Sequence, residues 1–125
     1  MLPAVYRRNK RNQQPITLTR NTSASIGVTL TDLEGETYVL NENETLRFGI
    51  KMRPESDAVQ VLKIIDSSAL DPEAGVYYFN LTPADTAELR LGNLWYDIVL
   101  QTGEDMYPVV DLSPVTVLAT AGGES

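Results

Sequence analysis

Apolar and polar residues alternate along several short stretches of this chain, and this is the period of a β-strand with one buried face. The alternation is clearest over residues 46–53 and 94–101. Less regular stretches rich in β-forming residues, each bounded by turn-forming residues, lie at 16–18, 26–30, 37–40, 58–65, 75–81, 106–112 and 115–119. Together they predict an all-β protein.

The chain between two of these strands carries the signals of one short helical turn, near 83–89. Thr82 suits the N-cap, and Pro83 suits the first helical position, where its missing N–H costs nothing. Asp85 follows near the positive end of the turn, and Gly92 breaks the helical pattern.

These elements predict an antiparallel, immunoglobulin-like β-sandwich of about eight strands. A chain of 125 residues is large enough to form one domain with its own core. We expect a flexible basic arm over 1–14, the sandwich over 15–120 and a flexible tail over 121–125. Pro108 indicates that its strand lies at a sheet edge or carries a bulge.

Charge is divided unevenly between the start of the chain and the rest. Residues 1–20 hold five basic residues and no acid, for a charge of +5; the rest holds five basic and 17 acidic residues, for −12. The basic cluster consists of Arg7, Arg8, Lys10 and Arg11. It has no apolar period, so it is either a solvated tail or an arm that docks on the acidic body of a neighbouring subunit.

Nucleic acid is not an expected partner of this basic cluster. Lysine and arginine neutralise phosphates, but the acidic remainder of the chain would repel a duplex. No aromatic platform for stacked bases accompanies the cluster either.

The composition removes most common catalytic chemistry. The chain has no cysteine and no histidine, which excludes thiolate nucleophiles, Ser-His triads and nearly every zinc site. We therefore expect no enzymatic activity and no cofactor. The remaining enzymatic alternative is a glycosidase that uses two carboxylates, Asp97 with either Asp85 or Asp66.

Apolar runs in this chain are too short to cross a membrane. None reaches the roughly 18–20 residues that span a bilayer. We therefore expect synthesis in the cytoplasm and no membrane partner.

The strand at 94–101 has an unusually apolar second side, which carries Trp95, Asp97 and Val99. Aromatic residues at the centre of a contact surface are typical hot spots. We therefore expect these three residues to bind a partner, with core packing of Trp95 as the alternative. The matching side of the strand at 46–53 is basic, which indicates a solvated face or an acidic partner.

A second function remains compatible with the aromatic residues. If Trp95, or the pair Tyr77 and Tyr78, were exposed and coplanar, the sandwich would have the stacking surface of a carbohydrate-binding module. This is the alternative to a protein-interaction domain.

The segment Pro83-Ala84-Asp85-Thr86-Ala87, followed by Trp95-Tyr96, resembles the corner between strands E and F of immunoglobulin-like domains. In those domains a tyrosine hydroxyl hydrogen-bonds back to the corner backbone, and the resemblance implies this role for Tyr96. The chain departs from true immunoglobulins in having no cysteine pair and in the inserted Leu89–Leu94. The resemblance therefore implies a sandwich and no antibody-like function.

The chain also resembles small structural domains of tailed bacteriophages and prophages, as found in baseplate upper proteins and tail accessory proteins. The resemblance spans about 16–119 and rests on the order of four motifs: an acidic Glu-Gly turn before 38–40, the strand 46–50, the corner 81–89 and the strand 92–98. It implies a non-enzymatic virion structural protein, homo-oligomeric, that docks on other phage structural proteins.

Overall fold

Seven strands and one short helix make up the described part of the chain. The computed structural model describes residues 13–30, 35–36, 38–67 and 76–120. The elements in chain order are β1 (Ile16–Thr19), β2 (Ala24–Thr29), β3 (Glu44–Lys51), β4 (Val61–Asp66), β5 (Val76–Leu81), α1 (Pro83–Ala87), β6 (Gly92–Thr102) and β7 (Asp105–Leu118).

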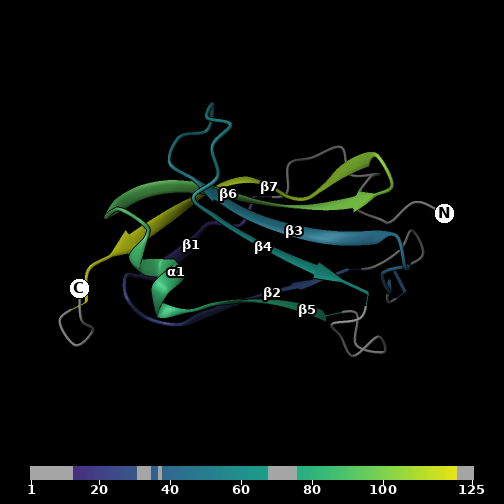
Figure 1. Cartoon of the computed structure of the whole chain (residues 1–125), viewed down its shortest axis with the longest axis horizontal. Coiled ribbons are helices and arrows are strands. Elements are labelled where there is room, and N and C mark those ends of the chain that lie inside the picture. Colours follow the sequence, from purple (N-terminus) through teal and green to yellow (C-terminus); the bar gives the residue numbers. More distant parts are fainter. Residues whose placement is uncertain (1–12, 31–34, 37, 68–75, 121–125) are drawn as a thin grey trace.

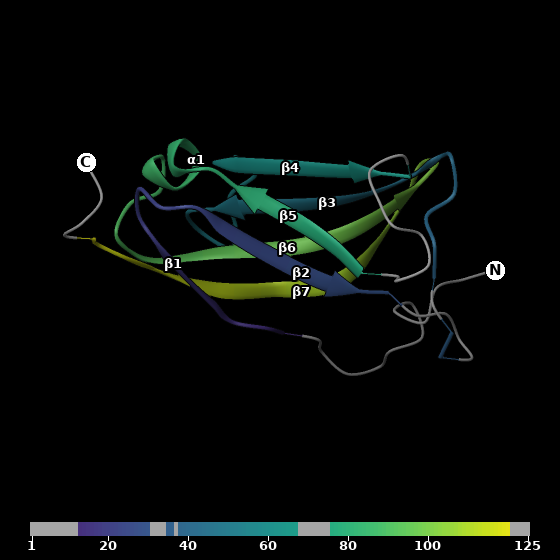
Figure 2. The same ribbon diagram turned by 90° about the horizontal axis from the view of Figure 1, so that it is seen from below.

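The strands form two layers. The larger sheet has the order β1-β7-β6-β3-β4, and the smaller one pairs β2 with β5. Figure 1 shows α1 at one end of the sheets, and Figure 2 shows β2 and β5 lying across the larger sheet as a second layer. The predicted all-β sandwich is confirmed.

The strand order also fits the immunoglobulin-like class. In that fold, strands C, F and G share one sheet, B and E share the other, and variable-type domains add C′ beside C. Here β3, β6 and β7 take the places of C, F and G, β4 takes that of C′, and β2 and β5 take those of B and E. α1 lies where the chain passes from E to F, as the corner motif predicted.

One strand pair departs from the antiparallel pattern that we expected. β1 runs parallel to β7, with Ile16 opposite Val115 and Thr19 opposite Leu118. A tight hairpin forces two strands to run antiparallel, but β1 and β7 are the first and last strands and share no hairpin. Their relative direction depends on long-range packing, which local sequence patterns do not encode.

The strand expected over 37–40 is absent from the described part of that segment, 38–40. The backbone N–H of Leu40 donates to the hydroxyl of Tyr77 at 3.1 Å, and the Tyr77 hydroxyl donates to the carbonyl of Tyr38 at 3.0 Å. A tyrosine side chain thus takes the place of a neighbouring strand. Thr37 itself lies outside the described residues.

The last two predicted strands, at 106–112 and 115–119, are one strand, β7. The pairing of β6 with β7 shifts register on both sides of Ile98, and Val99 lies opposite Pro108. The bulge expected at Pro108 is therefore present. β1 pairs with the other side of β7 only at Val115–Leu118, beyond Pro108.

Phe48 of β3 joins the two layers in the centre of the core. Its ring centroid lies 5.4 Å from that of Phe79 on β5 and 5.5 Å from that of Tyr96 on β6. Alternate residues of these strands are buried around it, as the alternation predicted: Leu46, Ile50, Tyr77, Leu81, Leu94, Ile98 and Leu100.

The corner before β6 begins as predicted. The Thr82 hydroxyl accepts a hydrogen bond from the backbone N–H of Asp85 at 3.1 Å, and the Asp85 carboxylate accepts one from the N–H of Thr82 at 2.8 Å. This reciprocal pair is a capping box. The buried Thr86 hydroxyl then fastens α1 to the turn after β1, where it bonds both the N–H and the carbonyl of Thr22.

The role expected for Tyr96 at this corner is wrong. Its hydroxyl donates to the carbonyl of Gln14, ahead of β1, and not to the corner backbone. The inserted Leu89–Leu94 segment separates Tyr96 from α1. The Tyr96 hydroxyl therefore reaches the residue just before β1 starts, whereas α1 contacts the turn after β1 ends.

A buried hydrogen-bond network holds the segment between β2 and β3. Glu44 is only 4% exposed. Its carboxyl oxygens accept from the Tyr38 hydroxyl at 2.8 and 2.9 Å and from the backbone N–H of Asn41 at 2.9 Å. Burial, followed by the hydrogen bond to Glu44, raises the pKa of Tyr38, so this hydroxyl stays a donor at neutral pH.

Replacing Tyr38 by phenylalanine is expected to lower the free energy of unfolding by about 1–3 kcal/mol, because the buried carboxyl of Glu44 loses a donor. Tyr78→Phe is the control, since Tyr78 is exposed, and it should change stability by less than about 0.5 kcal/mol. Urea unfolding curves of the two variants make the comparison. Equal losses in both would contradict the structural role of the network.

Candidate functional site

The most distinctive surface is the outer face, which we define as the side of β3 and β6 that points away from β2 and β5. On β3 it carries Arg47, Gly49 and Lys51, and on β6 it carries Trp95, Asp97 and Val99. These residues are directly opposite one another: Arg47 faces Val99, Gly49 faces Asp97 and Lys51 faces Trp95. All six are partly buried, so none is a fully solvated side chain.

Apolar side chains flank both sides of this face. On β4, Leu62 and Ile64 are 45% and 51% exposed, and they lie opposite Gly49 and Arg47. On β7, Pro108 lies opposite Val99 and Pro114 lies opposite Trp95. The outer face therefore has charged and polar groups at its centre, and apolar strips on β4 and β7 flank it.

The exposed apolar residues of β4 were missed at the sequence level. The sequence of 61–66 does not show which side of the strand is buried, because Lys63 points to the same inward side as the apolar Val61 and Ile65. Lys63 is tolerated there because its ammonium group pairs with Asp85 of α1 at 2.8 Å. An inward-pointing lysine on an edge strand, with apolar residues outside, is a signal that could have been recognised from the pattern alone.

Asp97 is the one carboxylate at the centre of the outer face. Burial raises its pKa above the usual value, and the positive charge of Lys51 partly offsets that rise. The two nearby arginines bond elsewhere: Arg47 donates to Gln101 at 3.5 Å, and Arg90 donates to backbone carbonyls of Met52 and Asn93. Asp97 is thus a desolvated carboxylate that a further cation would stabilise.

The structure does not bring together the carboxylate pairs considered for catalysis. Asp85 is held at the corner by Lys63, and the hydrogen bond from Lys63 lowers the pKa of Asp85. Asp66 pairs with Thr45, four residues along β3 from the Gly49 that faces Asp97; four strand residues span about 13 Å. Among the described residues, no group of three or more carboxylates could hold a metal ion.

The basic residues predicted to bind a partner, Arg7, Arg8, Lys10 and Arg11, lie outside the described residues, as does the expected tail at 121–125. The last two residues of the expected arm do contact the sandwich. The Gln13 side chain donates to the carbonyl of Leu112 at 2.9 Å, and the N–H of Gln14 donates to the hydroxyl of Ser113 at 2.9 Å.

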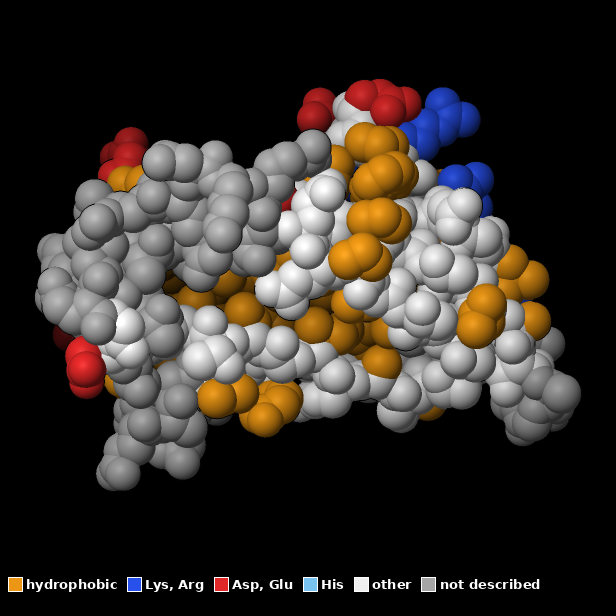
Figure 3. All heavy atoms as spheres, turned by 180° about the vertical axis from the view of Figure 1, so that it is seen from behind, with side chains coloured by type: hydrophobic (Ala, Val, Ile, Leu, Met, Phe, Trp, Pro, Cys, Tyr) orange, Lys and Arg blue, Asp and Glu red, His pale blue; other side chains and the backbone are white. Residues whose placement is uncertain are grey.

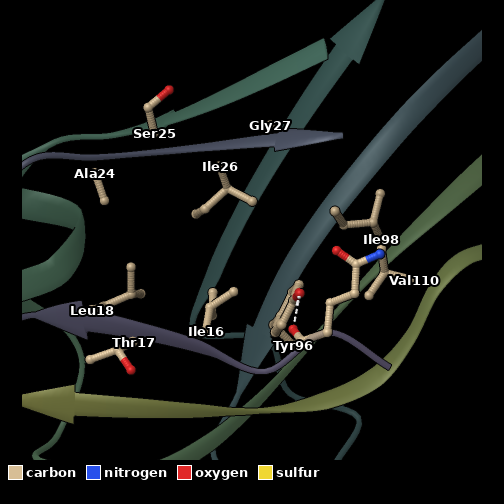
Figure 4. A pocket seen from close by; sticks show the side chains of 11 residues that line it. Ile16, Thr17, Leu18, Ala24, Ser25, Ile26, Gly27, Tyr96, Ile98 and Val110 are labelled. Atoms are coloured by element: carbon tan, nitrogen blue, oxygen red, sulfur yellow. Dashed lines mark hydrogen bonds between the residues drawn. The ribbon is translucent and has the colours of Figure 1, made fainter. Parts of the chain in front are cut away.

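A groove of about 390 Å³ opens between β1 and β2. Figure 3 shows hydrophobic side chains recessed in a hollow on one side of the molecule. Figure 4 shows the groove from close by, with Ile16, Leu18 and Ile26 pointing into it and Tyr96 bonded to Gln14. No charged residue lines the groove, so it offers apolar contacts and no acid–base chemistry.

The aromatic residues considered for carbohydrate binding are separated. Tyr77 is 1% exposed and belongs to the core. Tyr78 is exposed, but on the smaller sheet, where its ring covers Gly27; a Cβ added there would lie 2.9 Å from the ring. Trp95 lies on the outer face of the larger sheet. Trp95 is therefore neither a core residue nor part of a platform with Tyr77 or Tyr78.

No protein-family model and no curated protein sequence matches the chain. The solved structures that are similar to it include an enzyme and a phage domain. The endo-beta-1,4-mannanase from Thermotoga petrophila has a TM-score of 0.50 and 9% identity over 91% of this chain, which spans only 21% of that protein. The N-terminal domain of phage TP901-1 ORF48 has a TM-score of 0.44 and 14% identity, over 89% of this chain and 90% of that domain.

The likeness to the mannanase bears on the fold alone. At 9% identity, the mannanase supports the β-sandwich architecture and nothing about activity. In the described part of the chain, no helix is both long enough and apolar enough to cross a membrane.

Asp97→Asn is expected to raise the free energy of unfolding at pH 7 in dilute solution. Because the folded pKa of Asp97 lies above the unfolded value, the folded chain binds more protons between the two pKa values. Stability therefore falls as the pH rises through that window, which begins near the unfolded value of about 3.9. The asparagine variant should lack this fall.

Asp85→Asn is the matched control, with the opposite sign. The pKa of Asp85 is lowered in the folded chain, so its contribution is present at neutral pH and lost in acid. Urea unfolding from about pH 3 to pH 7 measures both variants. A less stable Asp97→Asn variant at pH 7 would contradict the desolvation of Asp97.

Proposed function

We propose that this chain is a non-enzymatic structural domain of a tailed phage or prophage particle, which acts by docking on its own copies and on other particle proteins. The observation that carries the interaction role is the outer face. It combines exposed leucine and isoleucine, a partly buried tryptophan and a desolvated carboxylate between two cations. The order of sequence motifs along 16–119 supports the phage class.

The chemistry of the described surface favours docking over catalysis. The carboxylate pairs considered for catalysis lie apart, Asp85 is paired with Lys63, and the β1–β2 groove is lined by neutral residues. An interaction surface, in contrast, needs anchors and a polar pattern that selects the partner. The outer face offers both.

The basic arm is proposed to strengthen such docking through charge. The turn between β6 and β7 carries Glu104 and Asp105, and its Gly103 N–H donates to the carbonyl of Asn43, next to Glu42. Two acidic turns thus lie side by side at one end of the sandwich. The arm of a neighbouring copy would find its opposite charge there.

A carbohydrate-binding module is the second candidate, and Trp95 is the observation that favours it. Its partly exposed ring lies on the outer face, opposite Pro114 of β7. Soluble β-1,4-mannan is a suitable probe, since the mannanase is one of the structures similar to this chain. A saturable change in Trp95 fluorescence on adding mannan would favour this candidate.

The direct test of the proposed function is whether the chain is part of a particle. Tailed particles purified by density gradient from the source of the sequence should contain it, by quantitative mass spectrometry, at a fixed ratio to the major tail protein. A chain that is abundant in the lysate but missing from intact particles would contradict the proposal.

A further inference from the structure

We propose that the groove between β1 and β2 accepts residues 1–6 of a second copy of this chain, which add to the free edge of β2 as a third strand of the smaller sheet. This arrangement gives the segment and the surface for self-association under the proposed function, on which it rests.

The smaller sheet covers only part of the larger one. Two strands, β2 and β5, lie across a sheet of five (Figure 2). Tyr96 and Ile98 of β6 and Val110 of β7 line the groove that this leaves beside β2. A two-stranded sheet is only marginally stable by itself, and a strand added beside β2 would widen this layer across the groove.

Two strand edges without charged side chains border the groove. The edge of β2 away from β5 and the edge of β1 away from β7 pair with no described strand. Neither β1 nor β2 contains a charged residue or a proline. Natural sheet edges are usually protected by such residues, as β4 is by the inward-pointing Lys63, and an unprotected edge is a template for another strand.

Apolar side chains beside these edges would contact the added strand. Figure 4 shows Ile16 and Leu18 of β1 and Ala24 and Ile26 of β2 pointing into the groove from opposite sides. Ile16, Ala24 and Ile26 pack against the core but remain partly exposed. An apolar occupant would remove this remaining surface from water, which is favourable.

Residues 1–6, with the sequence Met-Leu-Pro-Ala-Val-Tyr, fit the groove by composition and by position. They include no charged side chain, whereas the segments 31–34, 68–75 and 121–125, which also lie outside the described residues, each contain an acid. The described chain starts at Gln13, and Gln14 lines the groove. The segment is therefore joined to the sandwich at the groove itself.

Pro3 determines which residues of the segment would pair with β2. Proline has no N–H, so in an added strand it must lie where its backbone points away from the neighbouring strand. Backbone groups alternate between the two sides of a strand, so Leu2, Ala4 and Tyr6 would bond to β2. Their side chains share one face, and that face would fill the groove.

Exchange between copies is favoured over a hairpin within one chain. To enter its own groove, the segment would have to reverse direction within residues 7–12. That stretch holds Arg7, Arg8, Lys10 and Arg11, and like charges repel one another and extend a linker. Six extended residues span about 20 Å and would carry the segment to a neighbouring copy. Two copies that exchange segments make two identical contacts.

Substitutions on the two faces of the donated segment test the exchange. Leu2→Asp combined with Tyr6→Asp should raise the dimer dissociation constant at least about tenfold, because charges replace two apolar contacts in the groove. Val5→Asp is the matched control, since it lies on the opposite face of the added strand and should change the constant by less than about threefold. Analytical ultracentrifugation of the full chain and both variants measures the constants, and circular dichroism confirms that each variant is folded.

Cross-linking tests where the segment docks. The chain has no cysteine, so one can be placed at Ala4 and, in a separate variant, at Ser25, an exposed residue that lines the groove. A mixture of the Ala4→Cys and Ser25→Cys variants should give a heterodimer with a short bismaleimide, identified by mass spectrometry of the joined peptides. Leu62→Cys, exposed at the opposite edge of the larger sheet, replaces Ser25→Cys in the control mixture and should give none.

A full chain that stays monomeric at every concentration would overturn this inference, and so would a dimer that the Leu2→Asp and Tyr6→Asp substitutions leave unchanged. A mixture without the cross-link between positions 4 and 25 would do the same. None of these results would contradict the proposed particle role, whose test is the presence of the chain in purified particles. Exchange in a chain that is absent from particles would contradict the particle role alone.

Discussion

The antiparallel pairing of β3 with β6 is the constraint on which the rest of the structure depends. Side chains alternate between two faces in a strand, so a slip of one residue would exchange the core for the surface. In the observed register Phe48 and Ile98 meet on the inner side, while Gly49 and Asp97 meet on the outer side. The same register therefore sets both the packing against β5 and the charge pattern of the outer face.

Local sequence patterns were sufficient to predict the elements that depend only on residues close together in the chain. The strand at 46–53 and its partner at 94–101 show unbroken alternation, and the cap at Thr82 follows from side-chain chemistry within four residues. The same alternation predicted that Trp95, Asp97 and Val99 lie on one side of their strand, opposite to the core. The two faces of the central strands were thus predictable before any contact was known.

Features that depend on distant side chains were not predictable in this way. Tyr77 replaces a strand partner for 38–40, and Asp85 allows Lys63 to point inward on β4. Both effects join residues that are more than 20 positions apart in the chain. The parallel pairing of β1 with β7 and the hydrogen bond of Tyr96 to Gln14 likewise arise from the closure of the whole sandwich.

The candidate site was likewise only partly predictable from the sequence. Residue types on β3 and β6 were visible in the sequence, but their pairing, and the apolar strips of β4 and β7 beside them, came only from the fold. Together these features place two cations, a carboxylate and a tryptophan on one side of the larger sheet, with exposed apolar side chains beside them.

The account's central claim, that β2 accepts a strand from a second copy, is tested most directly by amide hydrogen exchange over Ala24–Thr29. Exchange at these amides should be slow at high chain concentration and should become faster as dilution separates the copies. Exchange that does not change across the dilution series would contradict the account.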